Sequence, residues 1–411
     1  MTAQLDLMSV FLNTFKLKPS LRSYPFSRPT QKGTPQKGKG WLTGIKRALL
    51  ALALLGFIPS LQADDNTNAA ANSAGEHWLV TVTDQVILPL YRDLETQAAK
   101  LVTSSKDFCQ QPNNEQLQQL RQAWLNTMLA WQRTDSLMFG PAIEEQLDFH
   151  INFTPPKKLI IKQLLNSDQP ITGETLNKNG VGGKGLSTLE YLLYDRERSD
   201  ADLLQDYVPE NSAAQRRCAY LQGVSELLHS DIQRITTPWL RTQNSYADSF
   251  RTAGAGSPMF VSQQEAIDTL ISKLYQSAEK TAGRRLAKPL GIRTKQAPKP
   301  YQLEAWRSGA SMALVKANLQ GIKMLLVDGG ILEHLTTQST AAKHTAQSLA
   351  QALDKAMALD VPADAFSVVD SDNSTALLPW YEQSQIIKNI IKNEVAAELG
   401  VQLGFNDNDG D

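Results

Sequence analysis

The sequence predicts an all-α fold built from helix bundles, and three observations lead to this prediction. Apolar residues recur at helical spacing through several long stretches, and turn residues separate these stretches. No stretch shows the alternation of β-branched residues that is typical of a strand. The two halves of the 411-residue chain carry similar numbers of helical stretches, which favours a duplicated bundle.

The helical stretches can be placed in order along the chain. In the first, Trp78, Val82, Val86 and Leu90 fall on one face. Prolines 289, 298 and 300 interrupt the pattern in the second half, because proline breaks a helix interior. The expected helices are 76–102, 114–139, 213–243, 262–286, 302–327, 340–359 and 378–400.

The charge of the chain is unevenly distributed. Residues 1–63 hold nine Lys or Arg and one Asp, which leaves 32 basic and 41 acidic residues in the remainder. An acidic remainder argues against nucleic acid or anionic lipid as a partner.

The N-terminal segment has the order of a secretory signal. Lys46-Arg47 precedes the apolar run Ala48–Ile58, and the small residue Ala63 follows. This order predicts export to the periplasm with cleavage near Ala63. The run is shorter than the ~20 apolar residues that cross a bilayer, so no transmembrane span is expected in the mature chain, although an uncleaved anchor is the alternative.

Composition also suggests the boundaries of the domains. Residues 64–75 are polar, and the stretch around 244–260 is rich in Ser, Gly and Ala. The predicted organisation is a long n-region with signal peptide (1–63), a polar linker (64–75), an N-terminal helical bundle (76–245), a connection (246–261), a C-terminal helical bundle (262–405) and an acidic tail (406–411).

The chain has two cysteines, Cys109 and Cys218. Export to an oxidising compartment predicts a disulfide between them, and two free buried thiols are the alternative.

A glycine-rich segment, Gly180-x-Gly182-x-x-Gly185, looks superficially like a phosphate loop. No strand pattern precedes it, and Lys184 is followed by glycine rather than Ser or Thr, so nucleotide binding is not expected. We interpret it as a flexible loop leading into a helix that Ser187 or Thr188 caps.

Glu190 is a carboxylate set in the apolar run that follows this loop. Such a group must be paired, protonated or a ligand, because an isolated buried charge is costly. The alternative is a capping box in which Glu190 bonds back to the helix start at Ser187.

The segment Gly185-x-Ser187-x-x-Glu190, followed by Tyr-Leu-Leu, resembles the Gly-x-His-x-x-Glu signature of the imelysin family, with serine in the histidine position. Trp131-Gln132, Glu304–Ser308 and Asn318-Leu319 resemble other family motifs, and the resemblance extends over residues 76–411. It implies two four-helix bundles side by side in an exported protein that is either iron-regulated or a metallopeptidase.

The resemblance also implies a site at the interface between the two bundles. Its binding cleft would contain Ser187, Glu190, Glu304, Arg307 and Ser308. Arg133 and Asp135 are weaker candidates of the same kind. The alternative for Glu304 and Arg307 is a surface pair along one helix.

The serine at position 187 bears on any metal chemistry at this site. A His and a Glu three residues apart share a helix face and can hold a metal ion together, whereas a serine hydroxyl is a poor ligand at neutral pH. Peptidase activity is therefore not expected. Iron or another divalent metal is the only cofactor that the resemblance implies, with Glu190 as its one candidate ligand.

The predicted function is that of a periplasmic binding protein linked to iron acquisition. Its ligand would be an unidentified small molecule or metal, and an iron-uptake protein would be its partner. A metal-dependent peptidase and a non-catalytic protein-interaction bundle are the alternatives.

Overall fold

The computed structural model describes residues 78–371 and 373–403, all within one compact unit, Gln62–Asp411. The prediction of an all-α fold is confirmed, since the described residues contain helices and turns but no strand. The predicted signal peptide, linker and acidic tail lie outside the described residues.

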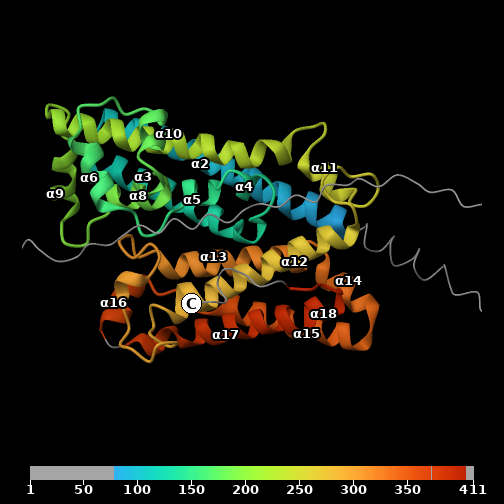
Figure 1. Cartoon of the computed structure of the whole chain (residues 1–411). Coiled ribbons are helices and arrows are strands. Elements are labelled where there is room, and N and C mark those ends of the chain that lie inside the picture. The colour runs from blue at the N-terminus through green and yellow to red at the C-terminus, as the bar shows by residue number, and fades with distance from the viewer. Residues whose placement is uncertain (1–77, 372, 404–411) are drawn as a thin grey trace, which may run out of the picture. The chain divides into compact units, whose positions relative to one another are not determined.

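The longer helices form two groups (Figure 1). In the first, α2 (Leu88–Gln110), α3 (Asn114–Arg133), α8 (Gly185–Leu193) and α10 (Ser212–Leu240) pack against one another. In the second, α12 (Gln263–Lys280), α13 (Ser311–Lys323), α15 (Thr340–Ala358) and α17 (Leu378–Ile390) do the same. The division into two domains at 246–261 stays a prediction, because α3 and α13 pack together within the one compact unit.

Shorter elements connect these helices. They are η1 (Thr83–Ile87), η2 (Asp135–Leu137), α4 (Pro141–Glu144), α5 (Leu147–Ile151), α6 (Lys158–Asn166), α7 (Gly173–Lys178), η3 (Val181–Gly183), α9 (Asp200–Leu204), η4 (Gln205–Tyr207), α11 (Tyr246–Arg251), η5 (Thr281–Ala287), η6 (Pro300–Gln302), η7 (Met324–Asp328), α14 (Ile331–Gln338), α16 (Ala365–Asp370), η8 (Ser374–Leu377), η9 (Ile391–Val395) and α18 (Ala396–Glu398). Four of them, η1, η5, η7 and η9, are single π-helical segments that continue a long helix.

The predicted apolar stripes are buried. Trp78, Val82, Val86 and Leu90 are each at most 3% exposed, and α3 buries Trp124 completely. Helical spacing therefore identified the core correctly, because the apolar face of each long helix packs against its neighbours.

The structure corrects one predicted helix start and adds a short helix to the predicted connection. The helix expected from residue 302 begins only at Ser311, because Ala305 and Gly309 have positive φ angles of 52° and 74° that no α-helix accommodates. The expected connection 246–261 contains α11, which Ser245 and Asp248 start with a capping box.

The disulfide prediction is confirmed. Cys109, near the end of α2, is bonded to Cys218 in α10. The bond ties together two helices that also pack side by side.

The described part of the chain has no helix that combines the length and the apolar character required to cross a membrane.

Candidate functional site

The helix that carries Glu190 is held in place at both ends. The hydroxyl of Tyr220 donates to the Gly183 carbonyl just before α8 (2.5 Å), and that of Tyr207 donates to the Leu192 carbonyl near its end (2.9 Å). Trp124 on α3 donates its indole N–H to the Leu186 carbonyl (2.9 Å). These three bonds from buried side chains fix the position of α8 in the first group of helices.

The glycines before α8 are needed for close packing. Gly185 has a φ of +78°, and a Cβ atom there would lie 2.4 Å from the Ile151 carbonyl oxygen. Gly182 and Gly183 are buried as well. The interpretation as a flexible loop is therefore replaced by that of a tightly packed approach, where neighbouring backbone excludes a side chain at Gly185 and neighbouring side chains crowd Gly182 and Gly183.

The predicted capping role of Ser187 or Thr188 is wrong. The helix begins two residues before Ser187, at Gly185, and no side chain caps it. The Ser187 hydroxyl instead donates to the Phe153 carbonyl at 2.6 Å. The alternative of a capping box with Glu190 is excluded for the same reason.

Glu190 is paired with a segment 118 residues further along the chain. Its Oε1 accepts hydrogen bonds from the backbone N–H (2.9 Å) and the hydroxyl (3.0 Å) of Ser308. Glu190 as a whole is only 4% exposed. Burial raises the pKa of Glu190, although Ser308 and the positive charge of Arg307 act in the opposite direction.

Arg307 lies next to this carboxylate and is held by two aromatic rings. Its guanidinium carbon is 4.1 Å from the centre of the Trp306 ring and 5.2 Å from that of Tyr191. The backbone N–H of Arg307 contributes a hydrogen bond to Glu190, whereas its guanidinium is partly exposed and contacts no hydrogen-bond acceptor among the described residues. Three of the predicted site residues, Glu190, Arg307 and Ser308, are thus brought together.

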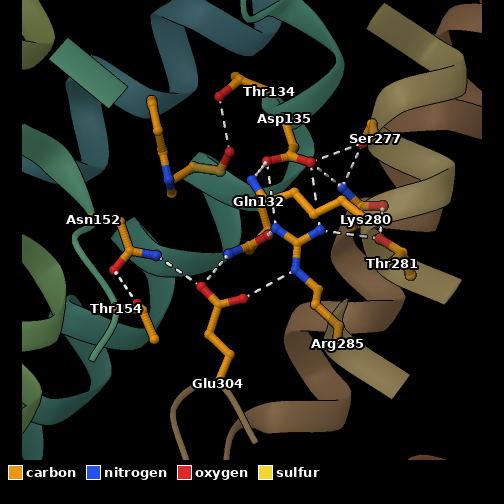
Figure 2. Close-up of polar contacts among 12 residues, drawn as sticks. Gln132, Thr134, Asp135, Asn152, Thr154, Ser277, Lys280, Thr281, Arg285 and Glu304 are labelled. Carbon is orange, nitrogen blue, oxygen red and sulfur yellow. Dashed lines mark hydrogen bonds and ion pairs between the residues drawn. The ribbon is translucent and has the colours of Figure 1, made fainter. Parts of the chain in front are cut away.

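Glu304 lies in a separate buried polar cluster (Figure 2). Its Oε2 accepts from Arg285 Nε (2.9 Å), and its Oε1 accepts from Asn152 Nδ2 (2.7 Å) and Gln132 Nε2 (3.2 Å). The alternative of a surface pair between Glu304 and Arg307 along one helix is therefore wrong. Residues 303–310 form turns rather than a helix, and the Glu304 carboxylate pairs with Arg285.

Asp135 forms the other half of this cluster. It accepts hydrogen bonds from Lys280 Nζ (2.7 Å), Ser277 Oγ (2.9 Å) and Asn318 Nδ2 (3.2 Å), and Arg285 lies 3.3 Å away. Burial alone would raise the pKa of Asp135, but the charges of Arg285 and Lys280 outweigh it and lower the pKa well below its usual range. The pKa of Glu304 is lowered by the same balance.

The buried polar cluster links the two groups of helices. Asp135 follows α3 in the first group, and Arg285 lies in η5 of the second (Figure 2). Asn318, on α13, also belongs to the second group. Arg133, the other weak candidate, turns away from it and pairs with Asp93 at 2.7 Å.

Arg285, the centre of the cluster, was not among the predicted site residues. A signal was present, because Arg285 continues the apolar stripe of Ile271, Leu274 and Ala278 at helical spacing. A charged residue on such a stripe requires a buried partner.

The donors near Glu190 do not fit a divalent metal. The Ser187 hydroxyl is committed to a carbonyl, and a guanidinium lies beside the single carboxylate. His150 contacts Asp231 (3.3 Å) and the Lys184 ammonium (3.1 Å). No group of three His, Cys, Asp or Glu side chains suited to a metal occurs in residues 78–371 and 373–403.

Two cavities of about 990 and 640 Å³ in the described chain are lined by residues outside the predicted cleft. The cleft around Glu190 therefore stays a prediction.

Comparisons with known proteins agree with the fold. The model of the imelysin family, which is classed among peptidases, matches residues 87–389. The chain is similar to iron-regulated protein A of Synechococcus elongatus, with 22% identity over 279 residues that cover 67% of this chain and 70% of the relative.

Two solved structures are also similar. An imelysin-like protein from Psychrobacter arcticum superposes with a TM-score of 0.65 and 22% identity, over 81% of this chain and 98% of the other. A candidate iron-regulated protein A precursor from Parabacteroides distasonis superposes with a TM-score of 0.67 and 18% identity, over 80% and 95%. At these identities the structures establish a shared fold.

Proposed function

The chain belongs to the imelysin family, and on that premise we propose that it is an exported binding protein of iron acquisition. The ligand contacts Arg307 where this residue lies against Trp306 and Tyr191 and interacts with the charge of Glu190. The link to iron is supported by the relative named iron-regulated protein A.

The proposal rests on the guanidinium of Arg307, which has no acceptor among the described residues. A partly exposed guanidinium with no acceptor in the described chain has its N–H donors available to a ligand. Its two aromatic neighbours hold it in one orientation, so that little conformational entropy is lost on binding. A carboxylate or another planar oxyanion of an iron chelate is the group that such a guanidinium binds best.

The chemistry at the signature favours binding over peptide hydrolysis. Ser187 uses its hydroxyl to hold the Phe153 carbonyl, and Glu190 is held by Ser308. The two groups that would share a metal in a family peptidase are therefore both engaged in contacts within the protein.

Iron uptake tests the proposal directly. Cells that lack the gene should take up less radioactive ferric iron under iron limitation, and the wild-type gene should restore uptake whereas Arg307→Gln should not. Arg198→Gln is the control, because it removes the same charge from an arginine that pairs with Asp206 (2.8 Å). N-terminal sequencing of the protein from the periplasm tests export, with a first residue near Asp64 expected.

Two results would overturn the proposal. One is unchanged iron uptake in the deletion strain. The other is divalent-metal-dependent cleavage of an unfolded protein by the purified chain, abolished in Glu190→Gln, which would establish the peptidase alternative.

A further inference from the structure

A cavity lies in the second group of helices, and Glu190 is not among the residues that line it. The cavity of about 640 Å³ is formed by the end of α12, the π-helical segment η5 and the turn region that follows, up to Gln302. This volume suits a small-molecule ligand. The charged residues that line it are Glu279, Lys280, Arg284, Lys288, Arg293 and Lys299. We call it the basic pocket.

The positive charge of the basic pocket is largely uncompensated. Lys280 pairs with Asp135, but Arg284 contacts only the Thr154 carbonyl and Lys299 only the Gln296 side chain. The side chains of Lys288 and Arg293 have no hydrogen bond or ion pair within residues 78–371 and 373–403. Four cations without an anionic partner thus face a single carboxylate.

Arg293 is placed by the shape of the adjoining backbone. A Cβ atom at Gly283 would lie 2.7 Å from Arg293 Nη2, so the guanidinium rests directly against the π-helical turn. Such turns are frequent at functional sites. The glycine is therefore what allows Arg293 to line the cavity.

The turn region is fixed by its own backbone. The Lys299 N–H donates to the Pro289 carbonyl (2.7 Å), and the Ile292 N–H donates to the Ala287 carbonyl (3.0 Å). Gly291 has a φ of +67°, and a Cβ atom there would lie 2.1 Å from the Gln296 carbonyl oxygen. The wall that carries Lys288 and Arg293 is thus formed before any ligand arrives, which reduces the entropy lost on binding.

A neighbouring lysine supports the sign of the local potential. Burial lowers the pKa of Lys388 on α17, and the charges of Lys392 and Arg293 lower it further against the opposing effect of Glu279.

We propose that the basic pocket binds a small multivalent oxyanion, either a polycarboxylate or a phosphate, with Lys288 and Arg293 as its principal contacts. Guanidinium and ammonium groups form their strongest hydrogen bonds with such anions. The pocket is distinct from the surface of Arg307, and the inference does not depend on the role in iron acquisition.

Calorimetric titration of the purified full chain with citrate and with pyrophosphate, at constant ionic strength, tests the inference. Saturable binding of citrate alone identifies a polycarboxylate site, binding of pyrophosphate alone identifies a phosphate site, and binding of either supports the inference. Lys288→Gln and Arg293→Gln should each weaken binding about tenfold, the effect of one lost charge-assisted bond.

The matched controls are Lys343→Gln and Lys355→Gln, which remove the same charge from exposed positions on α15. They should leave affinity within about twofold, because exposed charges act weakly at a distance. Arg307→Gln should also bind normally, so failure of the iron proposal can be told apart from failure of this one. Absence of saturable binding of both anions, or an equal loss in the controls, would overturn the inference.

Discussion

Replacing Arg285 by methionine should destabilise the protein severely, because Arg285 is the central cation of the buried polar cluster. Its side chain is 4% exposed and so is that of Asp135. It donates to Glu304, Gln132, Thr281 and Asp135. Asp135 would keep Lys280, but Glu304 would keep only neutral partners.

The magnitude follows from this uncompensated charge. Removing one partner of a buried ion pair costs about 3–5 kcal/mol. Arg133→Met is the matched control, because the Arg133–Asp93 pair has side chains 20% and 37% exposed. Such a pair contributes about 0.2–1 kcal/mol.

Equilibrium unfolding in urea, followed by circular dichroism, gives both values. The difference in the free energy of unfolding between wild type and Arg285→Met should become smaller as the pH falls. The lowered pKa values of Asp135 and Glu304 stabilise the wild type above the unfolded carboxyl range near about 4, and this contribution is lost as both groups protonate. Adding Glu304→Gln to Arg285→Met should recover part of the loss. A cost below about 1 kcal/mol, or one equal to that of Arg133→Met, would refute the reasoning.

Three further predictions concern other parts of the fold. Glu190→Gln should raise the free energy of unfolding at neutral pH, because the raised pKa of Glu190 means that the folded state disfavours the charged form. This gain in stability should vanish as the pH falls and Glu190 becomes protonated. Urea unfolding that gives the same difference between variant and wild type at pH 8 and pH 4 would contradict the prediction. Reduction of Cys109–Cys218 should cost about 3–5 kcal/mol, given the sequence separation of 109, whereas a double serine variant should not respond to reductant in the same unfolding assay. Gly180→Ala should cost about 1–2 kcal/mol for its positive φ alone, and Gly185→Ala should cost clearly more because its Cβ would also meet backbone; equal thermal shifts would show that packing plays no part.

Much of the fold could be predicted because the information is local. The spacing of Trp78, Val82 and Val86 identifies a buried helix face without knowledge of its partner. Boundaries were less predictable where a long-range contact decides the backbone, as in the turns around Ala305 and Gly309 that end only at Ser311.

The candidate site was predictable only in part. The position of Glu190 in an apolar run required a buried partner, but nothing in the sequence identified Ser308 as that partner. Glu304 was expected beside Arg307, three residues away, and instead lies with Arg285. Hydrogen-bond partners 118 or 150 residues apart depend on how helices cross, which a periodic pattern does not encode.

The sequence by itself determined the all-α class, the buried faces of the long helices, and the two cysteines available for a disulfide, because helical period and residue chemistry are properties of neighbouring residues. Only the tertiary structure decided that Gly182, Gly183 and Gly185 serve close packing, that Ser187 holds a carbonyl, and that Arg285 neutralises two carboxylates. Each of these depends on which groups come into contact across helices. Burial makes such contacts important for stability, because a buried polar or charged group without a partner is costly.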